Sequence, residues 1–81
     1  MIEREILVGP SFEASSAAKL VQAASQFKSR ISLVLEEKTA NAKSIMGIIS
    51  LDLQDGNTIK IIADGEDEQQ VIPELKKILG E

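Results

Sequence analysis

Lys43-Ser44-Ile45-Met46-Gly47-Ile48-Ile49-Ser50-Leu51 is the segment on which the fold of this 81-residue chain depends. Two local structures compete for it. Isoleucine favours strands, whereas a serine followed by an apolar run is typical of a capped helix start. We predict a short helix over residues 45–51, with Ser44 positioned to cap its first turn.

Alternating apolar residues on either side of this segment predict four strands. Residues 2–8 and 30–36 carry isoleucine and leucine on one face, and residues 58–63 carry Ile59, Ile61 and Ala63 in the same way. A polar turn at residues 36–38 leads into a short strand over residues 39–42. A second turn, Asp55-Gly56-Asn57, precedes the strand at residues 58–63.

Apolar residues at helical intervals predict two further helices. The first covers residues 14–27, and Ser15 or Ser16 can cap its start. The last is amphipathic between residues 71 and 79 and stops at Gly80. Pro73 removes one intrahelical hydrogen bond, so we predict that regular helix begins late, near residue 70 or 71, or bends at the proline.

The element order is therefore β-α-β-β-α-β-α over a single domain, residues 1–81. Strands and helices of these lengths predict an α+β fold in two layers, with the helices on one face of the sheet.

Composition excludes several functions. Cysteine and histidine are absent, which removes thiolate and imidazole chemistry. Thirteen acidic residues against nine basic ones give a net charge of −4, which disfavours direct nucleic-acid binding. No catalytic, cofactor or metal motif is present, and no apolar stretch is long enough to span a membrane. We therefore expect a cytoplasmic protein that is not an enzyme and holds no cofactor or metal.

An acidic run, Asp64-Gly65-Glu66-Asp67-Glu68, follows the strand at residues 58–63. It lacks the full ligand spacing of a calcium loop. We interpret it as a strand-to-helix turn, in which carboxylates are stabilised near a helix N-terminus.

The segment after Ser44 leaves two questions open. Ser44 can be a structural cap, or its hydroxyl can carry a phosphate stabilised at the start of the helix. The apolar residues that follow can all belong to the core, or some can form an exposed docking patch. In so short a helix they cannot all face inward.

Residues 43–51, with Asn41 before them, closely resemble the regulatory-serine segment of HPr, the phosphocarrier family of the bacterial sugar phosphotransferase system. They are equally similar to catabolite-repression HPr (Crh), the regulatory branch of that family. Residues 20–27 look like the family's first helix, and residues 63–68 look like its last strand-to-helix turn. The resemblance covers nearly the whole chain without gaps. It implies an HPr-like open-faced β-sandwich, a four-stranded antiparallel sheet with three helices on one side.

The chain departs from the family pattern at the carrier site. The family motif is Gly-[Leu/Ile]-His-Ala-Arg-Pro-Ala, and residues 11–17 here are Ser-Phe-Glu-Ala-Ser-Ser-Ala. Glu13 occupies the position of the phosphorylated histidine, Ser15 that of the arginine and Ser16 that of the proline. Glu13 cannot form a phosphoramidate, so histidine phosphocarrier function does not carry over.

The regulatory segment does match. The resemblance implies phosphorylation of Ser44 by HPr kinase/phosphorylase with ATP, and docking of a catabolite-control transcription regulator through Ile45, Met46 and Ile49. Two alternatives remain: an interaction module without phosphorylation, and a phosphotransferase-system component that uses Glu13, Ser15 or Ser16.

Overall fold

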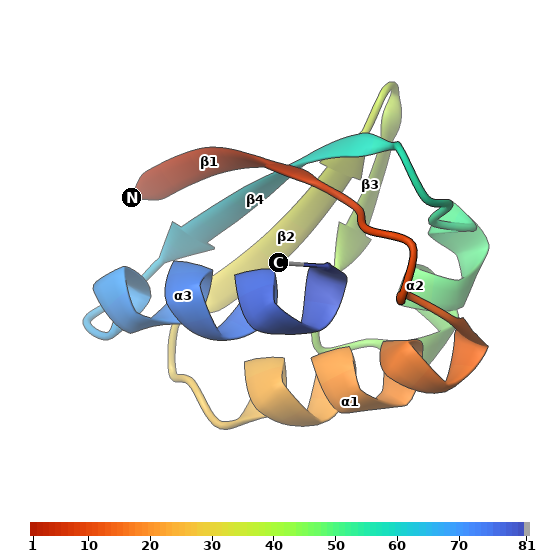
Figure 1. Ribbon diagram of the computed structural model, residues 1–81. Coiled ribbons are helices and arrows are strands. Elements are labelled where there is room, and N and C mark those ends of the chain that lie inside the picture. Colours follow the sequence, from red (N-terminus) through yellow and green to blue (C-terminus); the bar gives the residue numbers. More distant parts are fainter. Residues whose placement is uncertain (81) are drawn as a thin grey trace.

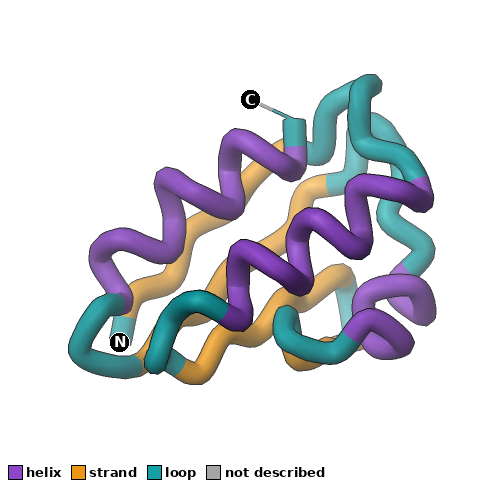
Figure 2. Tube along the Cα trace, turned by 90° about the horizontal axis from the view of Figure 1, so that it is seen from below, coloured by secondary structure: helices purple, strands orange, loops and turns teal. Residues whose placement is uncertain are grey.

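The computed structural model describes residues 1–80, which form a four-stranded antiparallel sheet and three helices (Figure 1). Strands β1 (Ile2–Leu7), β2 (Arg30–Leu35), β3 (Lys38–Asn41) and β4 (Thr58–Asp64) lie in the order β1-β4-β2-β3. Helices α1 (Ala14–Ser25), α2 (Ile45–Leu51) and α3 (Glu68–Leu79) cover one face and leave the other open (Figure 2). The predicted fold class and element order are confirmed, and the strand ends differ from the predicted ones by one residue.

The central strand, β4, organises the core. Its register pairs Ile61 with Arg4 of β1 on one side and with Leu33 of β2 on the other. Because side chains alternate along a strand, Ile59, Ile61 and Ala63 all point toward the helices and are buried. The two strands that flank β4 in the sheet, β1 and β2, come from distant parts of the chain, so the core depends on contacts between residues far apart in the sequence.

The helices close this core with residues spaced one turn apart. Helix α1 contributes Ala17, Leu20 and Ala24, and α3 contributes Val71, Leu75 and Leu79, all of them buried. The small alanines let α1 approach the sheet and its neighbours closely. Phe27, which we predicted as the last residue of the first helix, lies two residues beyond the end of α1 and packs against the core from the following loop.

Neither Ser15 nor Ser16 is the N-cap of α1, although the Ser16 side chain does take part in capping. The N-cap is Glu13, which has extended backbone angles, and Ser16 is the third residue of the helix. The Glu13 N–H donates to the Ser16 hydroxyl at 3.1 Å, and the Ser16 N–H donates to the Glu13 carbonyl at 2.9 Å. Ser16 therefore closes the reciprocal half of a capping box, and it is buried as a result.

The predicted late start of α3 is also wrong, because the helix begins at Glu68 and continues through Pro73 to Leu79. Its first turn is fixed from outside. The Glu68 side chain accepts the Gly65 N–H at 3.1 Å, and the Glu68 N–H donates to the Gly65 carbonyl at 3.3 Å. Pro73 lies on the exposed face, one turn after the exposed Gln69. The carbonyl of Gln69, which the proline cannot bond, is therefore on the side of the helix where water can reach it.

Candidate functional site

Ser44 caps α2, as predicted. Its backbone is extended, with φ −109° and ψ 114°, and its hydroxyl oxygen accepts the Gly47 N–H at 3.2 Å. The Ile48 N–H completes the first helical turn by donating to the Ser44 carbonyl at 3.0 Å. This cap supplies a partner for one of the N–H groups that a helix start leaves unpaired, which explains why the isoleucine-rich segment is helical.

The loop before Ser44 is held by two side chains. The Asn41 side-chain oxygen accepts the Lys43 N–H at 2.9 Å, and the Asn41 carbonyl accepts the Ser44 N–H at 3.0 Å. The Lys43 ammonium donates to the Phe27 carbonyl at 2.7 Å, which ties this loop to the end of α1. The Lys43 ammonium is therefore bound elsewhere and not to the Ser44 hydroxyl. The lysine that lines the same surface hollow as Ser44 is Lys38.

Helix α2 has a buried face and an exposed face. Ile48 and Leu51 are 2% and 3% exposed, whereas Ile45, Met46 and Ile49 are 39%, 69% and 56% exposed. We call the last three residues the α2 patch. The sequence left open whether the apolar residues after Ser44 are all buried or partly exposed; these three are exposed, and their docking role stays a prediction. They follow the capping serine within five residues of the chain.

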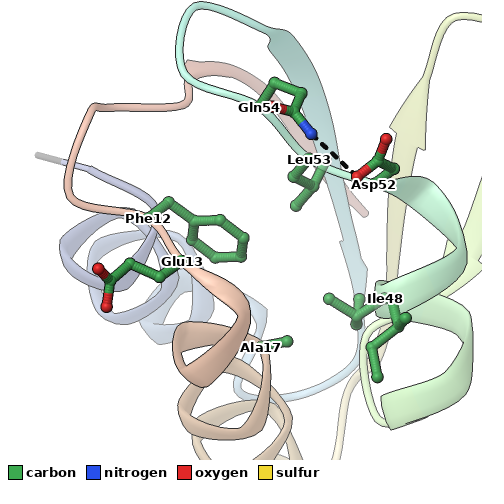
Figure 3. Close-up of a pocket in the computed structure, with 8 residues that line it drawn as sticks. Phe12, Glu13, Ala17, Ile48, Asp52, Leu53 and Gln54 are labelled. Atoms are coloured by element: carbon green, nitrogen blue, oxygen red, sulfur yellow. Dashed lines mark hydrogen bonds between the residues drawn. The ribbon is translucent and has the colours of Figure 1, made fainter.

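A pocket of about 310 Å³ borders the α2 patch. It lies between the start of α1, the inner side of α2 and the loop that follows α2, and Ile49 belongs to both the patch and the pocket. Figure 3 shows side chains from these three segments pointing toward one another across it: Phe12, Ala17, Ile48 and Leu53. Asp52 and Gln54 lie on its polar side, joined by a hydrogen bond of 2.9 Å.

Of the three positions singled out in the carrier motif, Glu13 lies at the other side of this pocket, and Ser15 and Ser16 are not among its lining residues. Glu13 is exposed, and its carboxylate points away from the pocket in Figure 3. The Ser15 hydroxyl donates to a Glu13 carboxylate oxygen at 3.5 Å, a long and weak contact. No Lys or Arg is among the described residues that line the pocket. The arrangement offers a carboxylate and two hydroxyl-bearing neighbours, but no imidazole and no guanidinium.

The acidic run forms a structural turn, as predicted. The Asp67 carboxylate accepts the N–H groups of Lys28 and Ser29 at 2.7 and 2.9 Å and also the Ser29 hydroxyl. These bonds, the Ser29 hydroxyl first, hold the pKa of Asp67 below its ordinary value. Among residues 1–80, no group of three or more acidic side chains is arranged to hold a metal ion. In the same part of the chain, no helix has the length and apolarity needed to cross a bilayer.

The element order and the sheet with helices on one face define an HPr-like open-faced β-sandwich, and comparison with known proteins identifies its family. The family model PTS-HPr, described as the PTS HPr component phosphorylation site, matches residues 6–81. The chain belongs to the HPr family. It is an HPr-like protein of the phosphotransferase system (PTS) or of catabolite control.

Similar proteins come from both branches of the family. The HPr-like protein Crh of Halalkalibacterium halodurans is 40% identical over 77 residues, covering 93% of this chain and 92% of that protein. The phosphocarrier protein HPr of Xylella fastidiosa is 38% identical over 80 residues, covering 96% and 90%. The crystal structure of HPr from Thermoanaerobacter tengcongensis superposes with a TM-score of 0.91 at 41% identity, covering 98% and 91%. Overall identity therefore does not separate the carrier branch from the regulatory one.

The sequence patterns missed the pocket. Phe12 lies before α1, whereas Asp52 and Gln54 lie in the segment after α2, about 40 residues further along the chain, and no periodicity connects the two segments. Among these residues, only Asp52 had a recognisable place in the sequence pattern, because it follows the last apolar residue of the predicted helix and so marks the helix end. Its backbone takes the left-handed conformation, with φ 51° and ψ 57°, that ends many helices.

Proposed function

We propose that this protein is a regulatory HPr-like protein that is switched by phosphorylation at Ser44 and does not carry phosphate on histidine. The observation that carries the proposal is the position of Ser44, a half-buried helix cap next to three exposed apolar side chains. By resemblance, the phosphoryl donor system is HPr kinase/phosphorylase with ATP. The partner of the phosphorylated form is a catabolite-control transcription regulator, which docks on the α2 patch.

The chemistry of the switch follows from the cap. Transfer from ATP forms a bond between the Ser44 oxygen and the γ-phosphorus, breaks the bond between that phosphorus and the β,γ-bridging oxygen, and releases the hydroxyl proton. The product adds about −1.5 to −2 charges beside the first N–H groups of α2, where negative charge is stabilised. Lys38, across the same hollow, is the nearby cation that remains available, because the Lys43 ammonium is bound to Phe27. The fold therefore tolerates the modification, and the patch beside it acquires a new charged edge.

The absence of histidine supports the second half of the proposal. A carrier needs a nucleophile whose phosphorylated form transfers the group onward, and imidazole does this through a phosphoramidate. The chain contains no histidine. Glu13 stands at that position of the family motif, with Ser15 in place of the arginine that pairs with the phosphate. A hydroxyl cannot give the bidentate, charged contact of a guanidinium.

Incubation with HPr kinase/phosphorylase and ATP, followed by mass-spectrometric phosphosite mapping, tests the switch. We expect one phosphate, at Ser44, and none in Ser44→Ala. Ser50→Ala is the matched control, because Ser50 is an exposed serine of the same helix and should leave labelling unchanged. Labelling that persists in Ser44→Ala would overturn the assignment.

Substitutions in the α2 patch test the docking half separately. Met46→Asp and Ile49→Asp should weaken binding of the phosphorylated protein to the transcription regulator and leave the thermal midpoint nearly unchanged, because both side chains are mostly exposed. A variant that unfolds would place its residue in the core. If Ser44 is not phosphorylated but the patch still binds a partner, the protein is a constitutive interaction module.

A further inference from the structure

We infer that the pocket between α1, α2 and residues 52–54 binds an arginine side chain of a partner protein. The inference rests on the docking surface proposed above, because Ile49 belongs to both the α2 patch and the pocket. It adds the chemistry by which that partner is recognised.

The size and the inner wall of the pocket suit a single long side chain. The volume is about 310 Å³, at the lower limit of ligand pockets, which span roughly 300 to 1,000 Å³. Ala17, Ile48 and Leu53 form a buried apolar wall, and the half-buried Phe12 ring closes one side. Such an apolar wall suits a methylene stem whose charged end remains at the rim.

The polar rim offers hydrogen-bond acceptors. One oxygen of Asp52 accepts the Gln54 side-chain N–H at 2.9 Å. The second oxygen of Asp52 and the side-chain oxygen of Gln54 have no hydrogen-bond partner among residues 1–80. The Glu13 carboxylate points away from the pocket and is not one of these acceptors, and none of the described lining residues is basic. A cation that enters the pocket therefore meets two acceptors and no charge repulsion.

The end of α2 adds to the negative potential. Asp52 is the C-cap of the helix, and the last turn contains no basic residue. The carbonyl groups at a helix C-terminus carry partial negative charge, which lysine, arginine or histidine usually complements from the same chain. The last turn of α2 has no such basic residue, and the pocket opens next to this end of the helix. The net charge of −4 also favours a basic partner.

Phe12 makes the pocket more suitable for arginine than for lysine. A guanidinium is planar and stacks on an aromatic face, and its fork of donors can reach two acceptors at once. Asp52 and Gln54 are hydrogen-bonded to each other, so both acceptor side chains lie on one side of the pocket. A lysine ammonium would gain the charge contact but not the stacking.

An NMR titration of the unphosphorylated protein with Nα-acetyl-arginine N-methylamide tests the inference. We expect chemical-shift changes that cluster at Phe12, Asp52, Leu53 and Gln54. The citrulline analogue, which has the same shape without the charge, should change them much less, and the lysine analogue should fall between the two. Equal effects of the arginine and citrulline compounds, or changes scattered over the acidic surface, would overturn the inference.

Two variants locate the contact. Asp52→Asn removes the charge but tolerates the left-handed backbone, and it should weaken arginine binding roughly two- to fivefold. Glu36→Gln is the matched control, because Glu36 is an exposed carboxylate with a similar φ, 56° against 51°, and it should leave binding unchanged. Phe12→Leu should reduce the preference for arginine over lysine. An unchanged affinity in Asp52→Asn refutes the site, whereas the kinase experiment on Ser44 does not depend on this result.

Discussion

Truncating two adjacent isoleucines of α2 to alanine should have very different costs. Ile48 is 2% exposed and Ile49 is 56% exposed, although they share one helix and one side-chain chemistry. The change removes three carbons beyond Cβ. At about 0.8 kcal/mol for each buried carbon, Ile48→Ala loses about 2.4 kcal/mol of transfer free energy. The cavity that it leaves raises the total cost to about 3 kcal/mol or more.

Ile49→Ala loses much less. Less than half of its surface is covered, so the transfer loss is about 1 kcal/mol. Water fills the space, which removes the cavity cost, and the higher helix propensity of alanine returns roughly 0.4 kcal/mol. In a domain of this size, 1 kcal/mol shifts the thermal midpoint by about 4 to 8 °C. We expect a decrease of about 12 °C or more for Ile48→Ala and only a few degrees for Ile49→Ala.

Urea and thermal unfolding followed by far-UV circular dichroism provide the measurement, because the chain has no Trp or Tyr for fluorescence. Similar losses of unfolding free energy in the two variants would contradict the division of α2 into a buried and an exposed face. The docking surface proposed above would fail with it.

Three further predictions follow from the site and from the turn before α3. Enzyme I with phosphoenolpyruvate should leave the protein without an acid-labile phosphate, and a stoichiometric label on the native chain would refute this. Glu13→His should not restore full phosphocarrier activity, because Ser15 cannot stabilise the phosphate as a guanidinium does. Asp67→Asn should be less stable than the native chain at neutral pH. The pKa of Asp67 is lowered in the folded state. Its contribution to the free energy of unfolding is therefore complete above the unfolded-state pKa of about 3.9 and is lost as the pH falls through the folded-state pKa. The difference in urea midpoint between the native chain and Asp67→Asn should disappear on acidification. Gly65→Ala should destabilise the fold, because the new Cβ would lie 2.5 Å from the Ser29 Cα and the backbone would have to move to relieve the clash. An unchanged thermal midpoint would contradict this prediction.

Local chemistry was sufficient to predict the elements. The capping serine marks the start of α2 within the sequence, and the predicted range of residues 45–51 is the observed one. The alternating apolar residues of the strands likewise gave their ends to within one residue. These features depend on hydrogen bonds and side-chain directions within a few residues, so a linear pattern contains them.

The start of α3 was predicted wrongly because some of the groups that stabilise it come from a distant part of the chain. The start of α3 is anchored by Gly65 and by the contacts of Asp67 with Ser29, a residue that lies 38 positions away. Those bonds hold the first turn in place even though Pro73 follows within the helix. The contact of Lys43 could not be predicted from the sequence either, since its ammonium binds the Phe27 carbonyl, just after the end of α1.

Tertiary packing decided which apolar residues face the core and where the pocket lies. The sequence predicted that a seven-residue helix with five large apolar side chains must expose some of them. The rotation of α2 against the sheet then buried Ile48 and Leu51 and exposed the α2 patch. The pocket needs Phe12, Ile48 and Leu53 from three separate segments. Such surfaces are invisible to a local pattern, because the contacts that create them form only when the chain closes β4 between β1 and β2.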